Sequence, residues 1–152
     1  MSLKDRLAND FKEAMKARDE IRKNTVSLAR AAIKQYEVDN RKELDDQGVT
    51  DILSKQVKMR KDALSDFEKA GRTDLLDAYN KEIEILMEYL PKQLTDDEIL
   101  TIVKETASEL NIDGGRQKMG KLIGAVMPKV KGRADGGKVK EIVENLLKQS
   151  EN

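Results

Sequence analysis

The sequence predicts an all-α protein, and three observations support this fold class. Apolar residues recur at intervals of three and four along almost the whole chain, which is the spacing of one helical face. No stretch sustains the alternation of apolar and polar residues that a half-buried strand requires. Residues that start or stop helices, such as Thr95 and Gly71, separate the apolar stripes.

Four apolar stripes precede Pro91, and we expect them to form long helices. A turn signal at residues 45–48 separates the second stripe from the third, and Asp51 is the expected N-cap of the third helix. Because proline interrupts the helical hydrogen-bond pattern, we expect the fourth helix to end at or just after Leu90. The four stripes include, in order, Leu7, Ile33, Met59 and Ile83.

Three shorter stripes follow. Thr95 and Glu98 form an expected capping box, because the hydroxyl can accept an unpaired backbone amide and the glutamate three residues later can return the bond. Asp135 is the expected cap of the last helix. We therefore predict an N-terminal part of long helices, residues 1–93, followed by a compact C-terminal three-helix bundle, residues 94–152.

The composition excludes several kinds of chemistry. The 152 residues include no histidine and no cysteine, which removes disulfides, imidazole or thiolate metal sites and histidine-based acid–base catalysis. Lysine and arginine total 29, as do aspartate and glutamate, so no net charge attracts nucleic acid or a membrane. We expect no cofactor, no metal and no catalytic constellation.

The chain also shows no address for export or membrane insertion. It meets charged residues at once after Met1, and its uncharged runs are far shorter than the roughly 20 residues that span a bilayer. We therefore expect a cytoplasmic protein with no membrane partner.

The charge is nevertheless segregated along the C-terminal part. Residues 94–115 carry six acids against one base, whereas residues 116–140 carry eight bases against one acid, a local net charge of +7. Such a segment is a candidate phosphate-binding surface, although it is also compatible with a solvated face that pairs with the acidic helix before it. The candidate nucleic-acid-binding residues are Arg116, Lys118, Lys121, Lys129, Lys131, Arg133, Lys138 and Lys140.

Two motifs that could bear chemistry are better explained structurally. Residues 115–122 nearly match a P-loop, but Leu122 replaces the hydroxyl that holds magnesium, and no strand is expected before the first glycine. The paired acids at 96–97 lie in the first turn of a capped helix, where negative charge is favoured by the helix dipole.

Four segments of the chain resemble the YqeY-like proteins of the GatB/YqeY family. The resemblance extends over almost the whole length and departs from the usual family string at Leu122–Ile123. The segments that carry it are Thr25–Glu37 (TVSLARAAIKQYE), Lys58–Asp77 (KMRKDALSDFEKAGRTDLLD), Glu82–Leu94 (EIEILMEYLPKQL) and Met119–Gly136 (MGKLIGAVMPKVKGRADG).

This resemblance implies a non-catalytic tRNA-binding or amidotransferase-accessory protein. The same helical module forms the C-terminal tail of the B subunit of glutamine-dependent tRNA amidotransferase, where it contacts the tRNA. The implied partners are tRNA, bound through its phosphates and shape, and an aminoacyl-tRNA synthetase or transamidase. Two alternatives stay open: a helical protein-interaction module that docks a synthetase or transamidase, and a carbon–nitrogen ligase that uses glutamine as amide donor.

Overall fold

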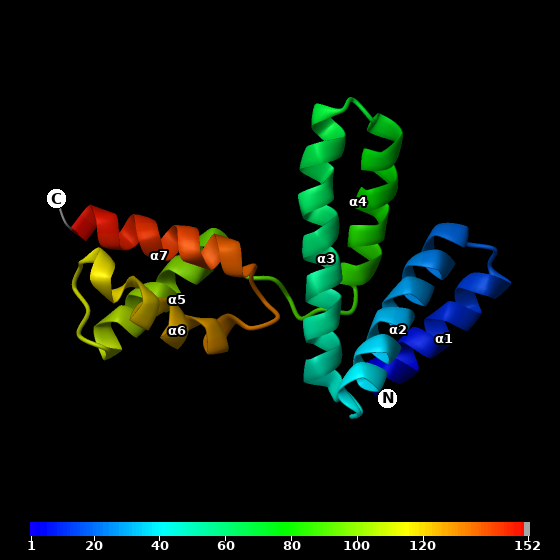
Figure 1. The fold of residues 1–152 in the computed structure, drawn as a ribbon, viewed down its shortest axis with the longest axis horizontal. Coiled ribbons are helices and arrows are strands. Elements are labelled where there is room, and N and C mark those ends of the chain that lie inside the picture. The colour runs from blue at the N-terminus through cyan, green and yellow to red at the C-terminus, as the bar shows by residue number, and fades with distance from the viewer. Residues whose placement is uncertain (151–152) are drawn as a thin grey trace. The chain divides into compact units, whose positions relative to one another are not determined.

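The protein is all-helical in the part of the chain that the structure describes. The structure is a computed structural model, and it describes residues 1–150 apart from the side chains of Arg116, Gln149 and Ser150. Its elements are α1 (Leu3–Lys16), α2 (Glu20–Asn40), α3 (Asp46–Lys69), α4 (Thr73–Met87), α5 (Asp96–Glu109), the 3-10 turn η1 (Arg116–Lys118), α6 (Met119–Val130) and α7 (Gly136–Ser150) (Figure 1).

The chain divides into two compact units, Met1–Leu90 and Pro91–Asn152. Each unit buries the apolar faces of its own helices, because an amphipathic helix is stable mainly through the face that it packs. In the first unit α1, α2 and the adjoining halves of α3 and α4 share one core. Its buried residues are Leu7, Val26, Ala29, Ile33, Val49, Leu53, Val57, Ile85, Leu86 and Tyr89.

The second unit has a separate core built by α5, α6 and α7. Its buried residues are Ile99, Val103, Ala107, Ile112, Leu122, Val126, Val130, Val139, Val143 and Leu147. The amide of Leu94 donates to the Arg133 carbonyl at 2.8 Å, which fixes the segment before α5 against the loop between α6 and α7. Among the described residues, no helix combines the length and the apolar character needed to cross a bilayer.

Side chains cap the starts of α1, α2, α3 and α5. Thr95 and Glu98 form the predicted capping box at the start of α5, and Ser2 and Asp5 form a second one at the start of α1. The predicted cap of α3 was wrong. Asp45, not Asp51, caps this helix, and its carboxylate accepts the Gly48 amide at 2.8 Å.

The residues expected to form a turn at 45–48 therefore form the Asp45 cap and the first turn of α3. Glycine suits this position because a Cβ on Gly48 would lie 2.7 Å from Cδ2 of Leu44. Leu44 packs against the core of the first unit, so the glycine leaves room for that contact.

Tyr89 ties the end of α4 to α1. Its ring is 3% exposed, and its hydroxyl donates to the carboxylate of Asp10. The guanidinium of Arg6 lies 5.0 Å from the ring centroid. Burial, together with the bond to Asp10, raises the pKa of the Tyr89 phenol well above its ordinary range.

The substitution Tyr89→Phe should lower the free energy of unfolding by about 1–2 kcal/mol near neutral pH, because it removes a hydrogen bond to a charged group. The wild type should also lose stability as the pH rises above the ordinary tyrosine value of 10. There the unfolded chain releases the phenolic proton that the folded chain retains.

Denaturant unfolding of both proteins at several pH values tests this prediction. The stability difference between the wild type and Tyr89→Phe should shrink above pH 10. A difference that stays constant into the alkaline range would contradict the assigned role of the hydroxyl.

Candidate functional site

The basic residues of the C-terminal unit are engaged by their neighbours at several positions. The ammonium of Lys129 lies 2.8 Å from the Thr106 hydroxyl and 2.9 Å from a carboxylate oxygen of Glu109, both on α5. The ammonium of Lys138 lies 3.3 Å from the carboxylate of Asp96, which is also on α5. The acidic helix α5 therefore neutralises part of the positive charge on α6 and α7.

Other candidate nucleic-acid-binding residues lie at opposite ends of α6. Arg133 donates to the Lys129 carbonyl at 2.7 Å and so satisfies the C-terminal end of that helix. Lys118 and Lys121 lie at the beginning of α6, whereas Lys131 follows its end, and a helix of 12 residues separates these ends by roughly 18 Å.

The remaining two candidate residues do not join the others into one surface. Lys140 is exposed on the first turns of α7, and the side chain of Arg116 is outside the described part of the chain. The assignment of these eight residues to a nucleic-acid interface stays a prediction, and the structure distributes them over both ends of α6.

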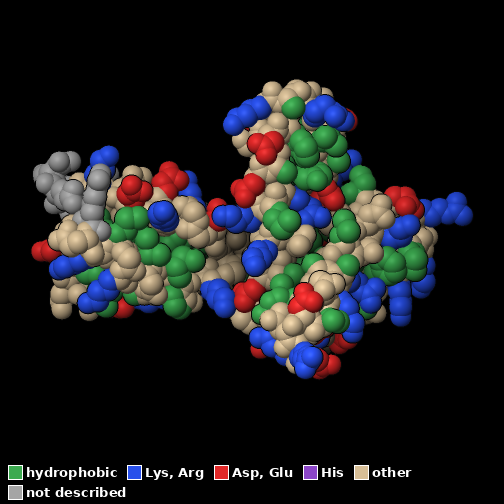
Figure 2. All heavy atoms as spheres, viewed as in Figure 1, with side chains coloured by type: hydrophobic (Ala, Val, Ile, Leu, Met, Phe, Trp, Pro, Cys, Tyr) green, Lys and Arg blue, Asp and Glu red, His purple; other side chains and the backbone are tan. Residues whose placement is uncertain are grey.

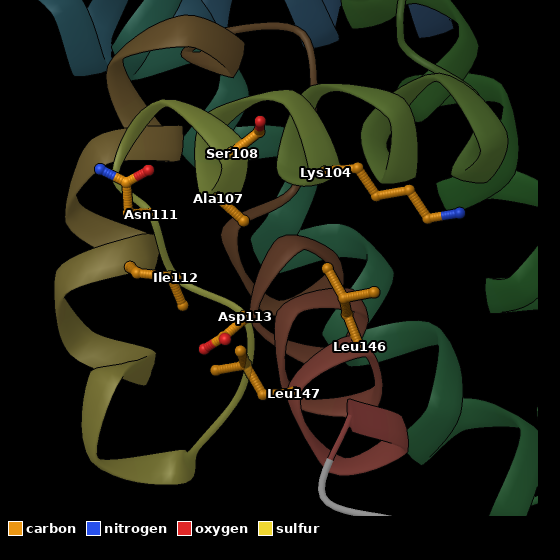
Figure 3. Close-up of a pocket in the computed structure, with 8 residues that line it drawn as sticks. All are labelled: Lys104, Ala107, Ser108, Asn111, Ile112, Asp113, Leu146 and Leu147. Atoms are coloured by element: carbon orange, nitrogen blue, oxygen red, sulfur yellow. The ribbon is translucent and has the colours of Figure 1, made fainter.

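A shallow depression of about 500 Å³ lies between the end of α5 and α7 (Figure 3). Ala107, Ile112 and Leu147 are almost completely buried and form its apolar part, while Asn111 and Asp113 are exposed. The full lining consists of Lys104, Ala107, Ser108, Asn111, Ile112, Asp113, Leu146 and Leu147.

This depression is explained by the way α5 ends. Asn111 adopts a left-handed conformation with φ of 57°, and the Ile112 amide donates to the Ala107 carbonyl at 2.8 Å. Such a C-cap folds the next apolar residue back over the helix. In Figure 3 the side chain of Lys104 extends away from Ser108, so these two polar groups do not converge on one point.

A second polar cluster lies between α1 and α2. The ammonium of Lys4 is 2.5 Å from the carboxylate of Glu37, which also accepts the Leu44 amide at 2.7 Å. The hydrogen bond from Lys4 lowers the pKa of the Glu37 carboxyl. Glu37 therefore connects the start of α1, the end of α2 and the loop before α3, which is a structural role.

The distal hairpin, which we define as residues 60–82, is the least covered part of the first unit. It comprises the second half of α3, the turn at Gly71 and the first part of α4. Among the described residues, the core of the first unit extends to Val57 on α3 and begins again at Ile83 on α4, so it includes no member of this hairpin. The closed end of the hairpin points away from α1 and α2 (Figure 1).

Apolar side chains on the distal hairpin are consequently only half-buried. The rings of Phe67 and Tyr79 pack edge to face with centroids 5.0 Å apart, which joins the two helices near the turn. Figure 2 shows hydrophobic side chains gathered on this end of the molecule. The half-buried residues are Ala63, Leu64, Phe67, Leu75, Leu76, Ala78 and Tyr79.

A buried arginine marks the base of the distal hairpin. Arg60 is 9% exposed, and its Nη1 donates to the backbone carbonyl and the side-chain oxygen of Gln56 at 3.1 and 3.0 Å. The carboxylate of Glu82 on α4 lies 3.7 Å from Nη2. The apolar core thus ends at the polar contacts of Arg60. Toward the turn at Gly71, α3 and α4 pack against each other and not against the core. Sequence reasoning missed this surface, because its apolar stripe is continuous with that of the core.

Comparisons with known proteins identify relatives of the chain. A family model described as "Yqey-like protein" matches residues 4–147. A relative from Lachancea thermotolerans, named "Altered inheritance of mitochondria protein 41, mitochondrial", is 40% identical over 85 residues, which cover 55% of this chain and 46% of the relative. This match therefore spans less than half the length of that relative.

Two longer matches carry the same name. The relative from Kluyveromyces lactis is 33% identical over 132 residues, covering 80% of this chain and 70% of the relative. The relative from Saccharomyces cerevisiae (strain YJM789) is 31% identical over 141 residues, covering 92% of this chain and 68% of the relative.

These relatives overturn two expectations. The expected tRNA-binding or amidotransferase-accessory function is wrong, because the relatives are named for altered inheritance of mitochondria. The expected partners, tRNA and a synthetase or transamidase, stay predictions, because the names of these relatives mention no partner. The expected cytoplasmic location is also wrong, because the relatives are mitochondrial proteins by name. Proteins that share a fold can differ in function, so a resemblance in fold does not by itself establish what a protein does.

The resemblance itself is confirmed. The family model covers nearly the whole chain, and the Kluyveromyces lactis and Saccharomyces cerevisiae relatives align over most of it. The chain belongs to the YqeY-like protein family.

Proposed function

We propose that this protein is a helical binding protein that shares the role for which its relatives are named, and that it acts by holding a helix of a partner protein against its distal hairpin. The observation that carries this proposal is the row of half-buried apolar side chains on α3 and α4 outside the core. A third amphipathic helix can pack its own apolar face against such a row of residues on two adjacent helices.

The charges around these apolar residues favour a protein partner. Lys61 and Lys69 share the exposed face of α3 with Asp62 and Asp66. At the turn, the guanidinium of Arg72 pairs with the carboxylate of Asp74 at 3.1 Å. A surface of mixed charge does not select a polyanion, so we expect a partner helix that has an apolar stripe flanked by both signs of charge.

The relatives supply the cellular context of the proposal. Their name refers to inheritance of mitochondria, and the Saccharomyces cerevisiae relative matches 92% of this chain. We therefore propose that this chain can replace that relative when it is directed to mitochondria.

We further propose that α5, α6 and α7 form a compact three-helix bundle that folds independently, with the domain boundary near residue 93. The support is the separate core of the second unit. The hydrogen bond from Leu94 to Arg133 closes this unit on itself.

Complementation tests the shared role. Expression of this chain behind a mitochondrial leader, in Saccharomyces cerevisiae that lacks the relative, should restore mitochondrial inheritance. The substitution Leu76→Glu should abolish most of this rescue, because it places a charge on the apolar surface that the partner helix must dehydrate. Met15→Glu is the matched control, since Met15 is an exposed apolar residue on α1, away from the hairpin.

The complementation experiment tests the shared role and the binding surface separately. If the wild-type chain gives no rescue, the shared role is wrong. If Leu76→Glu rescues as well as the wild type while both proteins are equally helical by circular dichroism, the distal hairpin is not the binding surface.

The isolated fragment 91–152 tests the proposed bundle. It should be helical by circular dichroism and should unfold in a cooperative thermal transition, although a chain of about 60 residues will be only marginally stable. A fragment that is unfolded at low temperature would contradict an independent bundle and its boundary.

A further inference from the structure

Helix α2 carries a stripe without charged residues on the side turned away from the core. Its buried side packs Val26, Ala29 and Ile33 into the first unit. Its exposed side includes six residues that are spaced along the sequence by three and four residues in turn. These residues are Ile21, Asn24, Leu28, Ala31, Gln35 and Val38, and all six are exposed.

This exposed stripe, which we call the α2 seam, contains no charged residue. Leu28 is 55% exposed and Val38 is 60% exposed, which places them among the most exposed large apolar residues described. An alternation of three and four over five steps is the heptad spacing of a coiled-coil interface. An isolated surface leucine needs no explanation, but a continuous uncharged stripe along a 21-residue helix indicates a partner.

We propose that the α2 seam binds the α2 seam of a second copy of this chain in an antiparallel pair. In that arrangement each layer of the interface joins one residue from each copy. The pairs are Ile21 with Val38, Leu28 with Ala31, and Asn24 with Gln35. Each pair occurs twice because the contact has two-fold symmetry.

The layers match in size and polarity. The large side chain of Leu28 faces the small side chain of Ala31, so the central layers fill without a gap. The two polar residues face each other, and their amide groups can exchange a hydrogen bond. Gln35 already donates one N–H to Asp39 at 2.8 Å, which leaves its carbonyl and a second N–H for Asn24 of the second copy.

The charges that flank the seam are also self-complementary. The two ends of α2 meet in an antiparallel pair, which brings Glu20 of one copy beside Arg41 of the other. Within one copy, Glu20 forms an exposed contact of 3.0 Å with Lys23 that is readily exchanged. On the same flank, Lys34 faces the neutral Ser27 of the second copy, so no like charges oppose each other there.

The interface consists of one helix from each copy, which is small for a protein dimer. We therefore expect reversible association in the micromolar range. The distal hairpin takes no part in this contact, so the dimer does not depend on the function proposed above.

Sedimentation analysis of the full chain tests the dimer. The wild type should form a reversible dimer, and Leu28→Glu should weaken the association by about 100-fold or more, since it buries an unpaired charge at the central layer. Met59→Glu is the matched control, because Met59 is 61% exposed on α3 and lies off the seam, and this variant should associate like the wild type.

Engineered cysteines test the orientation, because the natural chain has none. A mixture of Asn24→Cys and Gln35→Cys chains should form a disulfide-linked heterodimer, whereas Asn24→Cys alone should not link to itself. A wild type that stays monomeric up to about 100 µM overturns the proposal. So does a Leu28→Glu variant that dimerises normally, or an Asn24→Cys homodimer, which would indicate a parallel pair.

Discussion

The packing of the first unit is set by how much of its longest helix, α3, contributes to the apolar core. Helix α3 has 24 residues, but only its first half, with Val49, Leu53 and Val57, contributes to that core. A helix gains most of its stability from the face that it packs, so the second half of α3 relies on α4 alone. The polar contacts of Arg60 lie where this change occurs, and the exposure of the distal hairpin follows from it.

Charge organises the second unit in a different way. The acidic residues of α5 face lysines on α6 and α7, as the contacts of Lys129 with Glu109 and of Lys138 with Asp96 show. These pairs are partly exposed, so each adds little to stability. Their main consequence is that Lys129 and Lys138 are paired with acidic residues of α5, which reduces the positive charge that this segment presents.

Local features of the fold could be predicted from the sequence because they arise from neighbouring residues. The helical class follows from apolar spacing, and the capping box of Thr95 and Glu98 follows from side chains that reach their own backbone. The cap of α3 was mispredicted because the pattern at residues 45–48 indicates a turn before the helix, whereas Asp45 accepts the Gly48 amide and starts the helix there. The candidate basic site could not be judged from charge counts, because the counts do not show which lysines α5 neutralises. The expected function was wrong because a resemblance to a family indicates the fold more reliably than the function.

Two exposed surfaces on the first unit follow from the same architecture. The apolar side chains of the distal hairpin are half-buried because the core of the first unit does not extend to them. The α2 seam is exposed because α2 packs only its opposite face into that core. Both suit helix-to-helix contact, and they lie on different elements, so one chain can associate with itself and with another protein.

Hydrogen exchange of the backbone amides in the intact chain tests this account most directly. Amides in residues 64–69 and 76–80, which lie in the interior of the distal hairpin, should exchange through local opening. Their protection should be well below that of amides in residues 53–57 and 84–87, which belong to the core. Equal protection along the full length of α3 and α4 would contradict it, because it would show that the hairpin is as firmly held as the core.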